Sequence, residues 1–188
     1  KRSLYELGKR RFEEMGYKEI GMDHFALPSD PLYQAAQNNQ LHRNFMGYSP
    51  FHTQLMVGLG ASSISDSWTG FVQNVKNVEE YETLVHRGVF PFSKGHQLSQ
   101  QDLILRQHIL NLMCQFSTQW SLEDLNNPAV YKGLRKLAEM ENDGLVKRLP
   151  NQLIITEKGR PYVRNVCMCF DEYLWQKRPN TPIFSQTI

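Results

Sequence analysis

Hydrophobic and polar positions change their spacing several times along the chain, and each change predicts a new element. Apolar residues recur at helical spacing over residues 4–15, and Gly16 stands where a glycine after a helix is favoured. Residues 17–25 (YKEIGMDHF) predict a short buried strand, and a short helix is expected over Pro31 to about Asn39. A helix, a strand and a loop rich in side chains form one repeating unit of an α/β architecture.

The next apolar run, residues 53–65 (TQLMVGLGASSIS), predicts a second buried strand that enters a turn of small residues. Gly58 and Gly60 let a backbone come close to something else, either a ligand or a neighbouring strand. Signals are weak from there to Gly95, where we expect a helix over residues 78–86 and then a loop, GVFPFSKG.

Capping signals are stronger in the second part of the chain. Ser99 and Ser121 are each followed by Asp three residues later, a capping-box variant that opens a helical region. These regions are expected to run to about Phe116 and to Gly144. Two short β-like runs then flank the turn pair at 150–151, and a further helix follows. Helices, a two-stranded wing and a helix make the outline of a winged-helix module.

The pattern therefore predicts a mostly helical α+β chain in two regions, 1–95 and 96–188. A winged-helix module can bind DNA or serve as a packing module. The second region has a basic tint, but its candidate recognition helix, residues 130–142, ends in acidic residues. A solvated face is the better interpretation, and no nucleic-acid partner is expected.

Composition narrows the class of protein. Hydrophobic residues are 40% and charged residues 21%, as in ordinary globular proteins, and a net charge of +2 gives no strong attraction to nucleic acid or acidic membranes. No apolar run approaches the roughly 20 residues that span a bilayer. Three cysteines make no secreted disulfide framework, so we expect a cytoplasmic location. Lys1, in place of Met, indicates a segment of something longer or a trimmed N-terminus.

The cysteines also invite a metal interpretation. Cys167 and Cys169 are two residues apart, so on a helix they point to different faces and cannot easily grip one ion, even with Cys114 as a third ligand. Buried thiols that behave as small apolar residues are the better interpretation, and no metal ligand is expected in this chain.

Candidate chemistry gathers in residues 17–48. His24, His42 and Arg43 lie there among aromatic residues, and polar groups are costly to bury without partners. The stretch is therefore either a ligand pocket or a well-satisfied polar core. Arg43 offers a two-pronged donor for a carboxylate, whereas an isolated histidine is more often a core or surface residue.

Four longer motifs carry a family resemblance: GYKEIGMDHFALPSDPL, LHRNFMGY, GLGASSIS and GRPYVRNVCMCFDEYLWQK. Together they resemble the C-terminal part of oxygen-independent coproporphyrinogen III oxidases, over essentially the whole chain. GMDHFA followed by LHRNF also argues against the related haem-chaperone branch, which carries a different motif here.

The resemblance implies a fold and an activity. Residues 1–95 would be the last β/α units of a partial radical S-adenosylmethionine (SAM) barrel, of the TIM-like kind, and residues 96–188 a helical, winged-helix-like domain. The whole enzyme would use SAM and a 4Fe-4S cluster, with an external electron donor and acceptor, to convert two propionates of coproporphyrinogen III to vinyl groups. The CxxxCxxC motif that holds the cluster is absent from this sequence, so the chain alone is expected to be inactive. The whole enzyme is expected to be a monomer, whereas a half barrel with exposed strand edges is expected to self-associate.

Site residues follow from the same resemblance. Ile64 matches a position that contacts SAM, and Phe45 matches an aromatic residue on the side of a second SAM or the substrate. Met46 stands where some relatives have glutamine. Arg43, and more weakly His42 and His24, are our candidates for contacts to substrate carboxylates. The alternative functions are a haem chaperone that binds a tetrapyrrole and a winged-helix module that binds nucleic acid.

Overall fold

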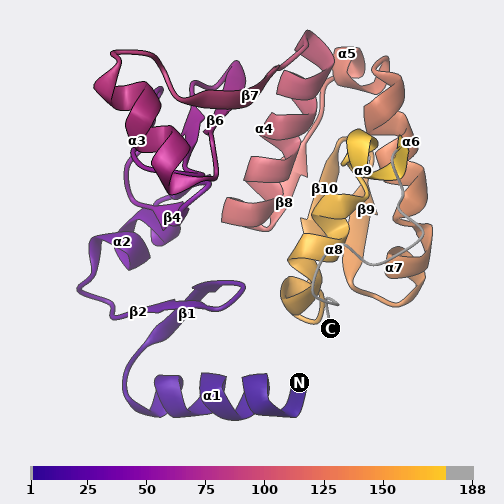
Figure 1. Ribbon diagram of the computed structural model, residues 1–188. Helices are drawn as coiled ribbons and strands as arrows, with labels where there is room; N and C mark the ends of the chain where they lie inside the picture. Colours follow the sequence, from indigo (N-terminus) through magenta and orange to yellow (C-terminus); the bar gives the residue numbers. More distant parts are fainter. Residues whose placement is uncertain (1, 177–188) are drawn as a thin grey trace.

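The computed structural model describes residues 2–176, which begin with helix α1 (Arg2–Glu14) and a small hairpin (Figure 1). Strands β1 (Lys18–Gly21) and β2 (His24–Ala26) pair antiparallel. The single strand predicted for residues 17–25 is therefore wrong. Met22, with φ of 54°, turns the chain inside that stretch, and its carbonyl accepts a hydrogen bond from the Tyr5 hydroxyl at 2.9 Å.

A short helix and a second hairpin follow. Helix α2 (Pro31–Gln37) confirms the short helix predicted there, and Asp30 caps it. Strands β3 (His42–Asn44) and β4 (Gly47–Ser49) pair antiparallel and place Arg43 opposite Tyr48. This hairpin carries the LHRNFMGY motif.

The buried strand predicted for residues 53–65 is also wrong over most of its length. Leu55 and Leu59 are 60% and 84% exposed, and residues 53–63 make one isolated bridge, from Met56 to Asp66. The buried Asn74 amide holds this loop instead, because its Nδ2 donates to the carbonyls of Gly58 and Gly60. A Cβ at Gly58 would lie 2.7 Å from the Ile64 carbonyl oxygen, so a neighbouring backbone makes the close approach there.

A three-stranded antiparallel sheet ends the first half of the chain. Its order is β5-β6-β7, and the helix predicted for residues 78–86 is confirmed. The loop predicted for GVFPFSKG is wrong in its second part, which is strand. The bounds are β5 (Ile64–Asp66), β6 (Gly70–Asn74), α3 (Val78–His86) and β7 (Phe92–Gln97).

Every strand pair within residues 2–176 is antiparallel, and these strands close no barrel. The links within the hairpins β1–β2 and β3–β4 are only two residues long, which permits antiparallel pairing alone. The architecture is thus a mixture of helices and small antiparallel sheets.

The second half follows the predicted outline of helices, a hairpin and further helices. Ser99 and Ser121 both make complete capping boxes with the predicted aspartates. A three-stranded sheet has the order β8-β10-β9. In the chain, helix α4 precedes β8, and helices α5, α6 and α7 lie between β8 and β9. The elements are α4 (Gln100–Gln115), β8 (Ser117–Gln119), α5 (Leu122–Leu125), α6 (Pro128–Lys136), α7 (Ala138–Asn142), β9 (Val146–Leu149), β10 (Gln152–Ile155), η1 (Arg160–Tyr162), α8 (Val163–Met168) and α9 (Glu172–Gln176).

The final helix expected from the sequence is in fact η1, α8 and α9 in succession. Phe170, which is 1% exposed, lies at the break between α8 and α9 and packs into the core. The last residues of that expectation, from 177 onward, lie outside the described part.

Helix α4 joins the two halves of the molecule, with the small sheets of the first half on one side and the β8-β10-β9 sheet and C-terminal helices on the other (Figure 1). Its Leu105 and Leu112 belong to the large core of the second half, whereas Cys114 belongs to a small cluster with residues of α2 and the first hairpins. Within residues 2–176, none of the helices combines the length and apolar character that a bilayer crossing needs.

Candidate functional site

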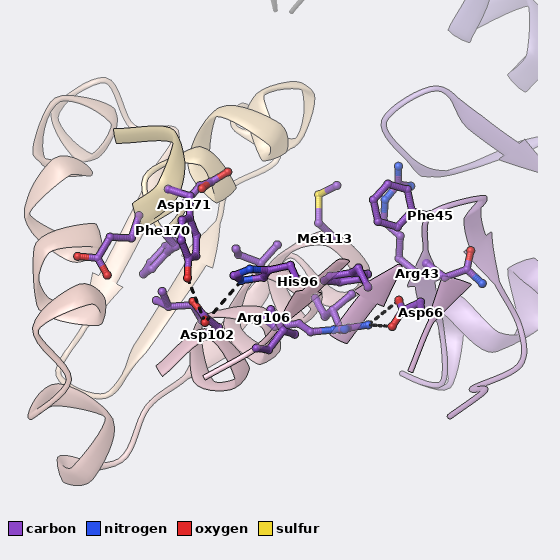
Figure 2. Close-up of a pocket in the computed structure, with 17 residues that line it drawn as sticks. Arg43, Phe45, Asp66, His96, Asp102, Arg106, Met113, Phe170 and Asp171 are labelled. Carbon is purple, nitrogen blue, oxygen red and sulfur yellow. Dashed lines mark hydrogen bonds and ion pairs between the residues drawn. The ribbon is translucent and has the colours of Figure 1, made fainter. Parts of the chain in front are cut away.

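A cleft of about 630 Å³ lies where the β3–β4 and β5–β6 hairpins meet α4 and the start of α9 (Figure 2). Its volume is in the range of small-molecule sites, about 300–1,000 Å³. The floor is apolar and comes from α4, with Leu105, Ile109 and Met113. Figure 2 shows Arg43 and Phe45 toward one end of the cleft and Asp171 toward the other. The site is therefore an apolar surface between two polar ends.

Arg43, which is half-buried, supplies the cation at the first end of the cleft. Its guanidinium carbon lies 4.6 Å from the centroid of the Tyr48 ring, and the Tyr48 hydroxyl donates to the Met113 carbonyl oxygen at 2.8 Å. Burial raises the pKa of Tyr48, so the ring stays neutral beside the cation. The Nη1 atom of Arg43 is buried and has no hydrogen-bond partner among residues 2–176. Because an unsatisfied buried donor is costly, this nitrogen favours an anionic ligand.

Arg106 of α4 also lines the cleft, but both of its Nη atoms already donate hydrogen bonds within the protein. Nη2 donates to both carboxylate oxygens of Asp66, at 2.8 and 2.7 Å, and Nη1 donates to the Trp68 carbonyl oxygen at 2.8 Å. The guanidinium also lies 4.8 Å from the ring centroid of Phe71. Asp66 neutralises Arg106, so a ligand meets the charge of Arg43 at this end.

Carboxylates dominate the opposite end. Asp102 accepts hydrogen bonds from the backbone nitrogen and hydroxyl of Ser99, at 2.8 and 2.7 Å. Burial raises the pKa of Asp102, but the bonds from Ser99 and from Tyr173 outweigh it, so the pKa is below its usual value and the group is ionised at neutral pH. His96 Nε2 lies 4.0 Å from the same carboxylate, and Asp171 adds a further acidic group. The cleft is thus polarised along its length.

The residues expected on the cofactor side divide between the cleft and the surface. Phe45 lines the cleft with a ring that is 58% exposed and meets Phe71 edge-on at 5.6 Å. Such an exposed ring next to an apolar floor suits a flat heteroaromatic group. Met46 is 86% exposed and does not line the cleft, and Ile64, at the start of β5, does not line it either.

His42 lies in a second cavity, of about 310 Å³, rather than in the cleft. Its ring is buried and meets the ring of His52 at 4.5 Å. Burial lowers the pKa of His42, and the charges of His52 and Arg106 lower it further, against a smaller opposing effect of Asp66. A neutral ring is a weak partner for a carboxylate.

His24 is also outside the residues that line the cleft. Its ring packs edge-on against Tyr48, with 5.0 Å between centroids. Its Nδ1 lies 3.1 Å from an Asp23 oxygen, without the geometry of a hydrogen bond. Of the three candidate substrate contacts, the structure brings Arg43 alone to the cleft.

Sequence reasoning missed Asp66, His96, Asp102 and Arg106 as lining residues. One signal was available for Arg106, because it interrupts the apolar stripe of the α4 helix between Leu105 and Ile109. Its partner could not be identified from spacing, since Asp66 lies 40 residues away in the chain.

The described cysteines do not fit an iron–sulfur cluster. Burial raises the pKa of Cys114 to about 12 and that of Cys169 to about 11, and it raises the pKa of Cys167 as well. A cluster ligand is a thiolate, which these surroundings disfavour. Within residues 2–176, no group of three or more His, Cys, Asp or Glu side chains is placed to hold a metal ion.

Comparison with known proteins gives one consistent result. The chain is 39% identical over 186 residues to oxygen-independent coproporphyrinogen III oxidase of Synechocystis, which covers 93% of this chain and 39% of that protein. It is 38% identical over 171 residues to the Escherichia coli protein of the same name, covering 87% of this chain and 37% of the relative. No protein-family model matches.

A solved structure agrees with the sequence relatives. Coproporphyrinogen III oxidase (HemN) from Escherichia coli, a radical SAM enzyme, matches with a TM-score of 0.81 and 36% identity, over 90% of this chain and 40% of that one. The chain thus spans about two fifths of the length of these relatives. The resemblance indicated by the four motifs is confirmed, and the chain belongs to the oxygen-independent coproporphyrinogen III oxidase family.

Proposed function

We propose that, within a whole enzyme, this chain forms one wall of the site where two propionates of coproporphyrinogen III are converted to vinyl groups, giving protoporphyrinogen IX. SAM and a 4Fe-4S cluster would supply the radical chemistry, and an external donor and acceptor would exchange electrons with the site. Family membership supports this reaction. The cysteines and the absent CxxxCxxC motif support placing the cluster ligands outside this chain.

The observation that carries the proposal is the buried, unpartnered Nη1 of Arg43 at one end of an apolar cleft. The proposed substrate combines a large apolar ring system with four carboxylates. Its ring system would lie along the α4 floor, and a propionate would accept from Arg43. His42 and His24 stay predictions as further carboxylate contacts, supported by the place of His42 on β3 and the packing of His24 against Tyr48 of β4.

On the cofactor side we propose Phe45, Met46 and Ile64. The exposed ring of Phe45 at the cleft supports a stacking contact. Met46 has an exposed thioether in place of the glutamine of some relatives, so it would contribute apolar contact rather than a hydrogen bond. Ile64 would act through its place at the start of β5, next to the glycine loop.

We further propose a division into a barrel portion, residues 1–95, and a winged-helix-like domain, residues 96–188. The winged-helix-like assignment is supported by the strand order β8-β10-β9, together with one helix before β8 and three helices between β8 and β9 in the chain. The domain would serve as a cover that excludes water from the radical chemistry. Nucleic-acid binding is less well supported, because Lys132 and Arg148 are already paired with Glu172 and Glu141.

We also expect the chain by itself to be cytoplasmic, catalytically inactive and self-associating. Large apolar side chains such as Leu4, Phe51 and Phe90 are at least 70% exposed, which supports contact with further protein. We expect the chain to be inactive because it lacks the cluster ligands. A stoichiometric iron–sulfur cluster in reconstituted protein would contradict that reason. A monomer in light scattering would contradict the self-association.

Titration with coproporphyrin III, the stable fluorescent porphyrin with the same four carboxylates, tests the proposal. We expect binding to the chain, and about tenfold weaker binding to the Arg43→Gln variant, as for the loss of a charge-assisted hydrogen bond. Arg148→Gln is the control, because it removes the same charge at a residue that lies outside the cleft. The tetramethyl ester of coproporphyrin III should bind the wild type and Arg43→Gln equally.

Equal affinity of the acid for wild type and Arg43→Gln would contradict the role assigned to Arg43. Tight haem binding with no preference for coproporphyrin would favour a haem chaperone.

A further inference from the structure

A buried ion pair connects the two halves of the molecule at the cleft. Asp66 ends β5 in the first half, and Arg106 lies in the second turn of α4 in the second half. The two side chains are 9% and 12% exposed, and Figure 2 shows their bonds across the cleft wall. The Arg148–Glu141 pair of the second half, by contrast, has side chains that are 40% and 33% exposed. The Asp66–Arg106 pair therefore differs from the surface pairs in its position and burial.

The pair also shapes the turn between β5 and β6. The Asp66 carboxylate accepts from the Trp68 backbone nitrogen at 3.0 Å, while Arg106 donates to the Trp68 carbonyl oxygen at 2.8 Å. Trp68 has φ of 64°, a conformation that costs energy for a bulky residue and persists only where its surroundings hold it. The ion pair supplies bonds to both sides of this residue.

From this turn, direct contacts lead to two residues on the proposed cofactor side. Phe71 pairs with Asp66 across the β5–β6 ladder, lies against the Arg106 guanidinium, and meets the ring of Phe45 edge-on. Ile64 precedes Asp66 by two residues on β5, so both side chains lie on the same face of that strand. Arg106 thus touches the element that carries Ile64 and the ring that supports Phe45.

We propose that Arg106 is a positioning residue, which holds Ile64 and Phe45 in place through Asp66 and Phe71. The significance for SAM rests on the proposed function, in which these two residues form the cofactor side. The second half of the chain then sets the geometry of the cofactor wall besides covering the cleft. A buried ion pair often adds little net stability compared with apolar residues, which favours a geometric role over a purely stabilising one.

The test compares Arg106→Gln, Arg106→Lys and the control Arg148→Gln in the 188-residue chain. Arg148 is a matched control because it too pairs with a carboxylate and donates to a backbone carbonyl, that of Leu134. Two NMR signals report position: the Ile64 δ-methyl group, assigned with Ile64→Val, and 4-fluorophenylalanine at position 45, assigned with Phe45→Leu. SAM is then titrated into each protein, and thermal unfolding is recorded in parallel.

We expect Arg106→Gln to shift both signals and to weaken SAM binding by about tenfold, within the range of typical site couplings. Arg106→Lys should fail to restore either property, because a single ammonium cannot reproduce the fork that reaches Asp66 and Trp68 together. Arg148→Gln should leave both signals and the affinity unchanged. If Arg106→Gln does not fold, Asp66→Asn carries the same comparison, since its remaining amide oxygen can still accept from Trp68.

Folded Arg106→Gln protein with both signals in their wild-type positions would overturn the inference, whether or not it is less stable. Shifted signals with unchanged SAM affinity would overturn the link to the cofactor. A wild-type chain that binds no SAM, but whose signals still move in Arg106→Gln, would support the positioning role while contradicting the proposed cofactor contacts. The two proposals can therefore fail separately.

Discussion

The two halves of the chain differ sharply in how they bury apolar side chains. The large core takes all of its fully buried members from residues 105–170, whereas the cluster of the first half is much smaller and borrows Cys114 from α4. Of the large apolar residues that are exposed, most lie between Leu4 and Phe92. The second half is thus the better-packed framework and supplies most of the residues that line the cleft, whereas the first half contributes Arg43 and Phe45 from a weakly packed surface.

This contrast explains why the cleft lies at α4. Tyr48 and Asp66 of the first half are fastened to Met113 and Arg106 of this helix. Side chains held only by their own hairpin, such as Met46, remain exposed. The second half therefore helps to fix the positions of first-half side chains, through the contacts of Tyr48 and Asp66 with α4.

The largest predicted effect is on the core of the second half. Leu153→Ala removes a side chain with no exposure on β10, and we expect the free energy of unfolding to fall by about 2–5 kcal/mol. Leu59→Ala is the same change at a side chain that is 84% exposed, and it should alter stability by less than about 0.5 kcal/mol. Urea unfolding followed by far-UV circular dichroism measures both. Similar losses in the two variants would contradict the contrast between the halves.

A smaller effect is expected at the fastening between the halves. Tyr48→Phe removes the hydrogen bond to the Met113 carbonyl oxygen, at a cost of about 1 kcal/mol. The loss should appear as faster amide hydrogen exchange in β3 and β4, with exchange in α8 unchanged. Equal acceleration in α8 would show that the halves open together.

The smallest predicted effect is a dependence on pH within the second half. His108 is 4% exposed, and its Nδ1 lies 2.8 Å from the Thr118 hydroxyl oxygen. Burial lowers the pKa of His108, against a small opposing effect of Asp124. The unfolded chain therefore takes up a proton near pH 6.5 that the folded chain resists, so stability should fall as the pH decreases through and below that value.

His108→Gln should reduce this decrease in stability, measured as urea midpoints between about pH 7.5 and about pH 5.5. The control is His86→Gln, since His86 is on the exposed surface of α3. An unchanged pH dependence in His108→Gln would exclude His108 as its source, leaving the buried His42 as the candidate in the first half.

Local signals in the sequence were sufficient for much of the second half. The Ser99 and Ser121 capping boxes form within three residues, and the β9–β10 hairpin surrounds the expected turn. The apolar run at residues 53–65 failed as a predictor because a strand depends on partners that are distant in the sequence, and this loop is held by Asn74 instead. The cleft could not be predicted for the same reason, because its lining residues are distant from one another in the sequence. Arg43 was identified from its chemistry, whereas the pairing of Asp66 with Arg106 depends on the tertiary fold.

Hydrogen exchange of the chain with and without coproporphyrin III tests the central claim most directly, namely that the site lies where the first half meets α4. We predict slower exchange in peptides that cover Arg43 to Phe45 and the α4 segment around Ile109, with no change in the β8-β10-β9 sheet. In Arg43→Gln this protection should largely disappear at the same porphyrin concentration. Protection confined to the β8-β10-β9 sheet, or equal protection in Arg43→Gln, would contradict the account.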